Sequence, residues 1–407
     1  MIGNPPWDVI PAGDVLRFTR DAGSYAAQGD GHANHYQLFV ERALSLTRPG
    51  GRVGLVVPSG LATDHGSAPL RRALLTRCDV DAIAGFDNHR GVFPIHRSVR
   101  FLLVSATAGS ATRSISCRLG LDDPAVLESA GDEPAPRSPW FPVRLSPEAL
   151  ERLSGPSLTI PHFRSVRDVA IAERAAALFP PLGDPAGWSA HFGRELNATD
   201  DRDAFRGPGR GLPIIDGKHV SPFRVDRSRS GRTISAADAS RRLRSDRHEH
   251  ARLCYRDVAS ATNRVTLIAA VLPPDCVSTH TVFCLRTPLA LRHQYFLCGL
   301  FNSFVVNYLV RLRVTSHVTT AVVERLPIPT MDTAPAAARE IAAIARRLAR
   351  RDDAAACARL HAVAAKLYQL TAEEFEHVLD TFPLIDEMLR HNCKKAMTEI
   401  DFDPPPM

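Results

Sequence analysis

Residues 35–60 read HYQLFVERALSLTRPGGRVGLVVPSG, and this stretch places a helix directly before a buried strand. Apolar side chains recur at helical spacing in its first half, at Tyr36, Phe39, Val40, Ala43 and Leu44. Gly50-Gly51 is typical of a helix end. The run RVGLVVP (52–58) is continuously apolar over the length of one strand, which indicates a strand buried on both faces. The segment therefore predicts an open α/β sheet.

The residues downstream continue the same alternation of helix and strand. LRRALLTR (70–77) predicts a second helix, because its leucines fall on one side. VDAIAGF (80–86) and SVRFLLVSA (98–106) predict two more strands. Helices between buried strands favour one α/β domain over residues 1–106.

Signals are weaker in residues 107–190, where small residues and prolines predict a connecting region. Residues 191–330 indicate a separate α+β domain, with strand-like runs at 212–223, 264–274 and 280–285. The run HQYFLCGLFNSFVVNYLV (293–310) contains His, Gln, Asn and Ser, so it predicts one buried helix rather than a membrane span.

The last part of the chain, residues 331–407, is predicted to be a helical tail. Residues 333–348 are alanine-rich, with an apolar stripe at helical spacing. Thr371 and Glu374 form a capping box before FEHVLDTF, which marks the start of another helix.

The composition narrows the class of protein. The 407 residues are 44% hydrophobic with a net charge of +6, and the pI of about 9.0 is compatible with an anionic partner. Eight cysteines show neither a C-x-x-C pair nor zinc-ligand spacing, which favours a reduced intracellular setting without a bound metal. The chain shows no signal peptide, and we expect a cytoplasmic protein without membrane contact.

The opening residues, MIGNPPWDV, form a rigid polar-aromatic corner. Pro5 and Pro6 each fix φ and hold the preceding residue extended. An exocyclic amine on a base is a poor nucleophile because its lone pair is delocalised into the ring. The Asn4 side-chain oxygen and the Pro5 carbonyl could accept hydrogen bonds from such an amine in a fixed geometry. Trp7 could stack on a base that has left its helix.

This corner resembles the catalytic motif Asn-Pro-Pro-aromatic of adenine-specific DNA methyltransferases of restriction–modification systems. The resemblance implies that Asn4 and Pro5 accept hydrogen bonds from the adenine amine, Pro6 makes the turn and Trp7 stacks on the base. Tyr is commoner in that last position. Glutamine and RNA methyltransferases share the motif, so those two substrate classes stay open.

Three further segments resemble the same family in the same order. Residues 35–60 look like its helix–strand–Pro-Ser segment, and residues 85–104 look like the later segment whose aromatic seats the flipped adenine. Phe93 is the candidate for that aromatic. Residues 253–285 and 300–329 look like the DNA target-recognition domain of the type IIG-like branch. The resemblance implies a partial Rossmann-like methyltransferase sheet in residues 1–106, the C-terminal half of a catalytic domain, and target recognition in residues 191–330.

The cofactor site of the family departs from this sequence. In the family, a glycine-containing loop that precedes the catalytic motif binds S-adenosylmethionine, and nothing precedes Met1 here. The glycine-rich stretch 23–32 follows no predicted strand, so it is not assigned as a cofactor loop. We therefore expect an N-terminally truncated chain in which the cofactor-binding motif is not present. Another chain that carries the cofactor-binding half is one expected partner.

Four side chains of the recognition-like domain are candidates for contact with double-stranded DNA: Arg256, Asn263, Arg264 and His317. Arg and Asn are the residue types that read guanine and adenine edges, and Arg also binds phosphate. An Arg256–Asp257 ion pair would instead make Arg256 purely structural. Residues 224–252 carry nine arginines against four acids, a pattern that fits either a solvated loop or phosphate contacts.

These observations predict methyl transfer from S-adenosylmethionine to the exocyclic amine of adenine in a specific DNA sequence, as part of a complete enzyme. The alternative is a DNA-binding recognition module or inactive fragment without a cofactor site. No G-x-S-x-G elbow or nuclease pattern indicates hydrolysis.

Overall fold

The computed structural model describes residues 1–29, 33–259, 263–314 and 317–400. The chain forms two compact units, Met1–Glu173 and Arg174–Met407. The first unit contains the strands and helices predicted around the opening corner. The second contains the recognition-like region and the helical tail.

The first unit is built on one mixed sheet with the strand order β1-β2-β4-β3-β5-β6. The strands are β1 (Ile2–Gly3), β2 (Arg52–Pro58), β3 (Cys78–Asp87), β4 (Arg100–Ala108), β5 (Ile115–Leu121) and β6 (Val143–Leu145). β1 runs parallel to β2, and β3 runs parallel to β5. β4 lies antiparallel between β2 and β3. The carboxyl ends of β1, β2, β3 and β5 therefore lie along the same edge of the sheet.

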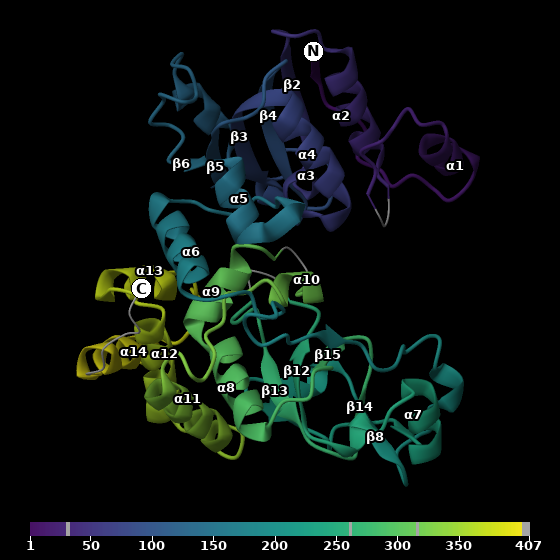
Figure 1. The fold of residues 1–407 in the computed structure, drawn as a ribbon, viewed down its shortest axis with the longest axis vertical. Coiled ribbons are helices and arrows are strands. Elements are labelled where there is room, and N and C mark those ends of the chain that lie inside the picture. Colours follow the sequence, from purple (N-terminus) through teal and green to yellow (C-terminus); the bar gives the residue numbers. More distant parts are fainter. Residues whose placement is uncertain (30–32, 260–262, 315–316, 401–407) are drawn as a thin grey trace. The chain divides into compact units, whose positions relative to one another are not determined.

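Helices α2 (His35–Leu46) and α4 (Ala68–Arg77) pack side by side on this sheet, α2 against β2 and α4 against β3 (Figure 1). Val57, Val80 and Ala106 are fully buried at the centre of the sheet. The prediction of an α/β fold with a Rossmann-like sheet is confirmed. The predicted strand 52–58 is confirmed residue for residue.

Further helices lie along residues 14–178. They are α1 (Asp14–Asp21), α3 (Gly60–Thr63), α5 (Pro147–Ser154) and α6 (Val166–Leu178). The sheet continues through β5 and β6, in a stretch where the sequence predicted only a connecting region. The division of the chain at residues 106, 190 and 330 stays a prediction.

The second unit contains two small sheets and a two-stranded ribbon. The larger sheet is antiparallel in the order β13-β12-β15-β7, and the smaller has the order β11-β8-β14. The strands are β7 (Phe192–Gly193), β8 (Leu212–Ile215), β9 (Val220–Ser221), β10 (Arg224–Val225), β11 (Thr233–Ile234), β12 (Arg252–Arg256), β13 (Ala269–Leu272), β14 (Val277–Ser278) and β15 (Val282–Leu285). The expectation of an α+β organisation is confirmed.

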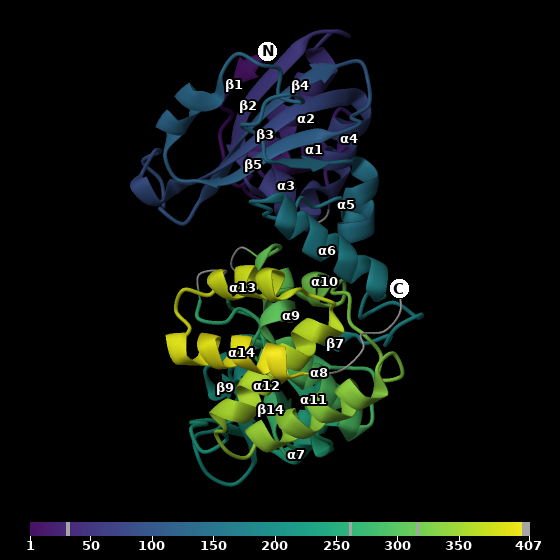
Figure 2. The same cartoon turned by 90° about the vertical axis from the view of Figure 1, so that its left-hand side faces the viewer.

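Helices make up most of the second unit after residue 290, where α11 (Pro335–Leu348), α12 (Ala354–Leu367), α13 (Ala372–Asp380) and α14 (Glu387–Glu399) follow one another (Figure 2). The helices between α6 and α11 are α7 (Ala236–Leu243), α8 (Leu291–Asn302), α9 (Phe304–Arg311) and α10 (Thr320–Val323). α8 packs on β12 and β13 and against α11. The capping box of Thr371 and Glu374 at the start of α13 is confirmed.

The prediction of one buried helix over residues 293–310 is wrong in one respect, because the run forms two helices. Ser303 has extended backbone angles (φ −69°, ψ 151°) and separates α8 from α9. Its hydroxyl accepts a hydrogen bond from the Val306 amide at 3.3 Å, which satisfies a free donor at the start of α9. Hydrophobic periodicity continues through such a break, so the apolar pattern alone did not reveal it. Within the described ranges, no helix is long and apolar enough to cross a membrane.

Candidate functional site

The Asn4-Pro5-Pro6-Trp7 corner follows β1 at the carboxyl edge of the first sheet. Ile2 and Gly3 pair with Gly54 and Leu55 of β2, so Asn4 is the first residue beyond the ladder. Pro5 is buried, whereas Asn4 is exposed. This arrangement anchors the corner through its first proline and leaves the carboxamide accessible.

Backbone hydrogen bonds hold the exit of the corner. The His35 amide donates to the Asp8 carbonyl at 2.9 Å, and the Ile10 amide donates to the Ala33 carbonyl at 2.8 Å. These bonds tie residues 8–10 to the start of α2. The corner is thus held at both ends, by β1 on one side and by α2 on the other.

An aromatic cluster lies behind the corner. The Trp7 ring contacts Phe93 edge to face, with centroids 5.4 Å apart, and lies 6.2 Å from Phe101. Phe93 and Phe101 meet at 4.9 Å, and Phe101 stacks on Phe86 at 5.2 Å. The structure therefore brings together Trp7 and Phe93, two side chains that lie 86 positions apart in the sequence.

Trp7 and Phe93 touch each other, so a flat base cannot enter between them. Both rings are half-buried and keep part of their surface exposed. Any flat group that packs here would therefore meet the exposed surface of one ring and not the space between the two. Stacking of this kind contributes about 1–3 kcal/mol per base.

Asn88 is a residue of this site that the sequence reasoning missed. Its side chain is fully buried at the end of β3. The Asn88 Oδ1 accepts from the Phe93 amide at 2.9 Å, and its Nδ2 donates to the Phe93 carbonyl at 3.1 Å. One carboxamide thus holds both backbone groups of Phe93. An Asn two residues after a predicted strand and five residues before the candidate aromatic was the available signal.

Charged groups gather at the base of the loop that carries Phe93. Asp87 and Arg100 form an ion pair at 2.6 Å, with both side chains largely buried. Burial, with the positive charges of Arg100 and Arg164, lowers the pKa of His162 to about 4. His162 is consequently neutral near pH 7.

The strand ends of this unit do not fit a glycine-lined cofactor cradle. Such a loop needs a glycine whose missing side chain leaves room for the ligand. A Cβ at Gly60, after β2, would lie 2.3 Å from Asp64 Oδ2, and one at Gly91, after β3, would lie 3.4 Å from the Arg97 guanidinium. The Asp64 side chain occupies the place beside Gly60, whereas a Cβ at Gly91 would make only ordinary van der Waals contact with Arg97. We therefore assign no S-adenosylmethionine-binding residue within the described part of this unit.

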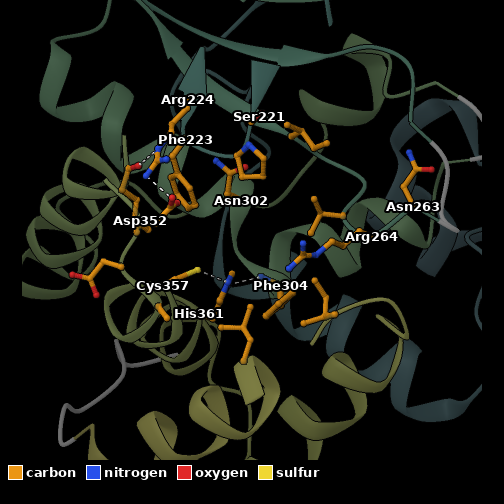
Figure 3. Close-up of a pocket in the computed structure, with 18 of the residues that line it drawn as sticks. Ser221, Phe223, Arg224, Asn263, Arg264, Asn302, Phe304, Asp352, Cys357 and His361 are labelled. Carbon is orange, nitrogen blue, oxygen red and sulfur yellow. Dashed lines mark hydrogen bonds and ion pairs between the residues drawn. The ribbon is translucent and has the colours of Figure 1, made fainter. Parts of the chain in front are cut away.

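In the second unit, Arg256, Asn263 and Arg264 line one cavity of about 690 Å³. Figure 3 labels Asn263 and Arg264 among the residues of this cavity. The proposed Arg256–Asp257 ion pair is not formed. Asp257 instead binds Arg194 at 3.0 Å, and its Oδ1 lies 3.3 Å from Nδ1 of His317. His317 is not among the residues that line this cavity.

Intramolecular ion pairs engage much of the arginine-rich stretch 224–252, which contains α7 and is therefore not a simple solvated loop. Its paired residues and their partners are Arg224 with Asp352, Arg232 with Asp216, Arg241 with Asp238, Arg242 with Asp201 and Asp203, and Arg252 with Glu195. Arg244 is exposed and has no such pair in the described structure. Fewer arginines are available for phosphate than the sequence suggested. No group of His, Cys, Asp and Glu in the described ranges could hold a metal ion.

The first unit thus has an α/β fold, and its Asn4-Pro5-Pro6-Trp7 corner lies at the carboxyl ends of the parallel strands. Residues 1–93 match the family model described as Eco57I restriction-modification methylase. The match contains the corner, helix α2, strand β2 and Phe93. The comparison with curated proteins found no match to the chain.

The comparison with solved structures found matches at low sequence identity. The type IIL restriction-modification enzyme MmeI, solved in complex with DNA, matches with a TM-score of 0.50 and 11% identity, covering 98% of this chain and 57% of that one. The type IIG restriction endonuclease BpuSI matches with a TM-score of 0.38 and 11% identity, covering 95% and 51%. The chain thus spans about half the length of these structures. At such identity the likeness to MmeI supports the fold alone.

Proposed function

We propose that this chain takes part in methyl transfer to the exocyclic amine of adenine in DNA, as an adenine-specific DNA methyltransferase of a restriction–modification system. The observation that carries the proposal is the position of the corner. Asn4-Pro5-Pro6-Trp7 begins directly after a parallel strand, and its aromatic contacts Phe93. The family match over residues 1–93 supports methyl transfer as the reaction class.

In this proposal, the chain's own residues bind and orient the amine. The Asn4 Oδ1 and the Pro5 carbonyl accept hydrogen bonds from the two N–H groups. These bonds return electron density to the nitrogen as it attacks. Neither acceptor needs to be ionised to raise the electron density on the nitrogen, and the proton that the methylated amine loses passes to water. Pro6 keeps the two acceptors in a fixed geometry, which lowers the reorganisation needed in the transition state.

The aromatic groups compensate for the removal of the base from its stack, which requires a few kcal/mol. Trp7 presents the stacking surface, and Phe93 supports it. Because Asn88 holds both backbone groups of Phe93, it positions this support.

S-adenosylmethionine is the methyl donor that the family resemblance implies. Its binding residues would come from outside the described strand ends, which do not fit its cradle. We propose a partner chain as one source of those residues, and we place the reaction in the cytoplasm.

The second unit would bind double-stranded DNA. Arg256, Asn263 and Arg264 gather in one cavity, which supports a shared role in binding. His317 lies beside the buried Asp257, which holds its ring at an exposed position. We propose all four as DNA contacts. A DNA-binding module without methylation is the second candidate, favoured by the absence of a cofactor cradle at the described strand ends.

Replacement of Asn4 by Ala tests the assignment in cells that carry the natural genomic region of the gene. Asn4→Ala removes one hydrogen-bond acceptor, so N6-methyladenine should fall by about 100-fold or more, as when one transition-state hydrogen-bond partner is lost. Nucleoside mass spectrometry of the cellular DNA measures this change.

Asp8→Asn is the matched control, since Asp8 is exposed one residue beyond the corner. It should leave methylation unchanged, and Asn4→Ala should leave DNA binding within about twofold because the acceptor acts in the transition state. Normal methylation in Asn4→Ala, or equal loss of methylation and DNA binding, would refute the role given to Asn4. No methylation with the wild-type gene would favour the binding module.

A further inference from the structure

The cavity of the second unit is enclosed by segments far apart in the sequence (Figure 3). Its walls come from the β9–β10 ribbon, the end of β12, residues 263–268, the start of α9, the loop before α12 and residues 385–389. Phe223 and Phe304 are buried in these walls, and Val265 and Ile268 add aliphatic surface. A volume of about 690 Å³ lies in the range typical of small-molecule sites.

The acidic groups of the cavity are already neutralised. Asp352 binds Arg224 at 3.0 Å, and the Arg224 Nε also donates to the Leu348 carbonyl at 2.8 Å. Asp353 binds Arg347 and accepts from the Ala356 amide at the start of α12. Neither carboxylate is therefore available to balance further positive charge.

The histidine and cysteine of the cavity carry no charge near neutral pH. His361 stacks on Phe304 with centroids 3.9 Å apart, and its Nδ1 accepts from the Phe304 amide at 3.2 Å. Its Nε2 therefore carries the proton and faces Cys357 Sγ at 3.4 Å. Burial lowers the pKa of His361 to about 3 and raises the pKa of Cys357 to about 11.

Two guanidinium groups remain without a partner. In the described part of the chain, neither Arg256 nor Arg264 has a side-chain hydrogen bond or ion pair. Arg256 is half-buried, and the loss of hydration lowers its pKa. Arg264 is exposed at the rim of the cavity, and its positive charge lowers the pKa of the Cys357 thiol against the larger effect of burial. The half-buried Arg256 therefore has a desolvation cost that a bound anion would offset, and Arg264 adds a second positive charge beside the same cavity.

We propose that this cavity binds one nucleotide. Arg256 and Arg264 would hold its phosphate, and the face of its base would lie against the apolar cavity wall. Guanidinium groups match phosphate oxygens in geometry as well as in charge. The phosphate ester could belong to a free mononucleotide or to a nucleotide unit of a DNA strand. The inference sharpens the DNA contacts proposed for the two arginines, and it does not depend on methyl transfer.

Calorimetric titration of the full chain with AMP, adenosine and inorganic phosphate, without a methyl donor, tests this inference. AMP should bind saturably at one site, and adenosine should bind at least about tenfold more weakly because it lacks the charged group. Arg256→Gln and Arg264→Gln should each lower the affinity for AMP by about tenfold. Arg346→Gln is the control, because Arg346 is exposed on α11 and does not line the cavity.

Thermal unfolding of each variant checks that the second unit stays folded. Val265→Trp, which fills the cavity from its wall, should abolish AMP binding without removing an arginine. A second outcome is that AMP fails to bind while a 5′-phosphorylated DNA oligonucleotide binds the wild type and binds both arginine variants more weakly. That result would assign the bound nucleotide to a DNA strand.

The inference is overturned if neither AMP nor the 5′-phosphorylated oligonucleotide binds, if adenosine or inorganic phosphate binds as tightly as AMP, or if both arginine variants bind like the wild type. Since no methylation is measured, failure here leaves the role of Asn4 unaffected. Conversely, loss of the Asn4 assignment would leave AMP binding unchanged.

Discussion

At the scale of single residues, one carboxamide holds the backbone of Phe93, the aromatic residue that contacts Trp7. Asn88 is fully buried and uses both its oxygen and its nitrogen on Phe93. Its Nδ2 also lies 3.4 Å from the Ile95 carbonyl. A buried polar group with satisfied hydrogen bonds is difficult to replace, since each substitution leaves backbone groups without a partner.

Asn88→Asp should loosen the Phe93 loop. The variant retains an acceptor for the Phe93 amide but places a carboxylate oxygen against carbonyl oxygens. The free energy of unfolding should fall by about 1–3 kcal/mol, and methylation should fall with it because Phe93 loses its fixed position. Urea unfolding and nucleoside mass spectrometry measure the two effects. His89→Gln, at the next position, is the control because His89 is exposed. If it lowered stability and methylation as much as Asn88→Asp, the role of Asn88 in positioning Phe93 would be refuted.

At the scale of elements, the break between α8 and α9 depends on Ser303. Besides accepting from the Val306 amide, its hydroxyl donates to the Leu300 carbonyl at 2.7 Å. Ser303→Ala should lower the free energy of unfolding by about 1 kcal/mol, the usual effect of losing an N-cap. Chemical denaturation measures this change. An unchanged midpoint would show that packing alone sets the break.

The buried pair of Glu195 and Arg252 joins two sheets of the second unit. Glu195 receives two hydrogen bonds from Arg252, and it accepts from the Ser278 amide at 2.7 Å. Burial raises the pKa of Glu195, but the Arg252 charge and these hydrogen bonds outweigh burial and lower it below the ordinary carboxyl range. The unfolded chain therefore binds the proton more tightly.

This lowered pKa predicts how stability depends on pH. The stabilisation is complete above the ordinary carboxyl pKa and is lost as the pH falls through the lower value of the folded state. Glu195→Gln should reduce that acid-dependent loss. It should also destabilise the protein at pH 7 by about 3–5 kcal/mol, because Arg252 would be left buried without a counter-charge. Thermal unfolding of the wild type and of Glu195→Gln between pH 7 and pH 3 measures both effects. If the stability of the two proteins fell equally with pH, Glu195 would not be the source of the acid-dependent loss.

At the scale of the whole molecule, the charge of +6 favours an anionic partner. If the chain binds duplex DNA through phosphate contacts, affinity should fall by about tenfold or more between about 50 and about 200 mM salt. Fluorescence anisotropy measures this dependence. Arg244→Gln should reduce the slope of log K against log salt by about one, since Arg244 is exposed and unpaired in the described structure. A slope near zero would argue against phosphate contact.

Local patterns in the sequence were sufficient for much of the first unit. The strand 52–58, the helix before it and the rigid Asn4-Trp7 corner follow from neighbouring residues, because periodicity and proline geometry act over a few positions. The capping box of α13 follows for the same reason. Ser303 shows the limit, since the apolar pattern continues through the break and does not reveal that this serine caps a new helix.

Only the tertiary structure decided which distant residues meet. Trp7 lies against Phe93 because β1 and the loop after β3 end on the same edge of one sheet. Arg256 and Arg264 share a cavity whose acids are already paired with other arginines. The sequence by itself determined the chemical groups of both sites. Contacts between residues far apart in the chain depend on how the strands pair and the helices pack, which no short stretch encodes.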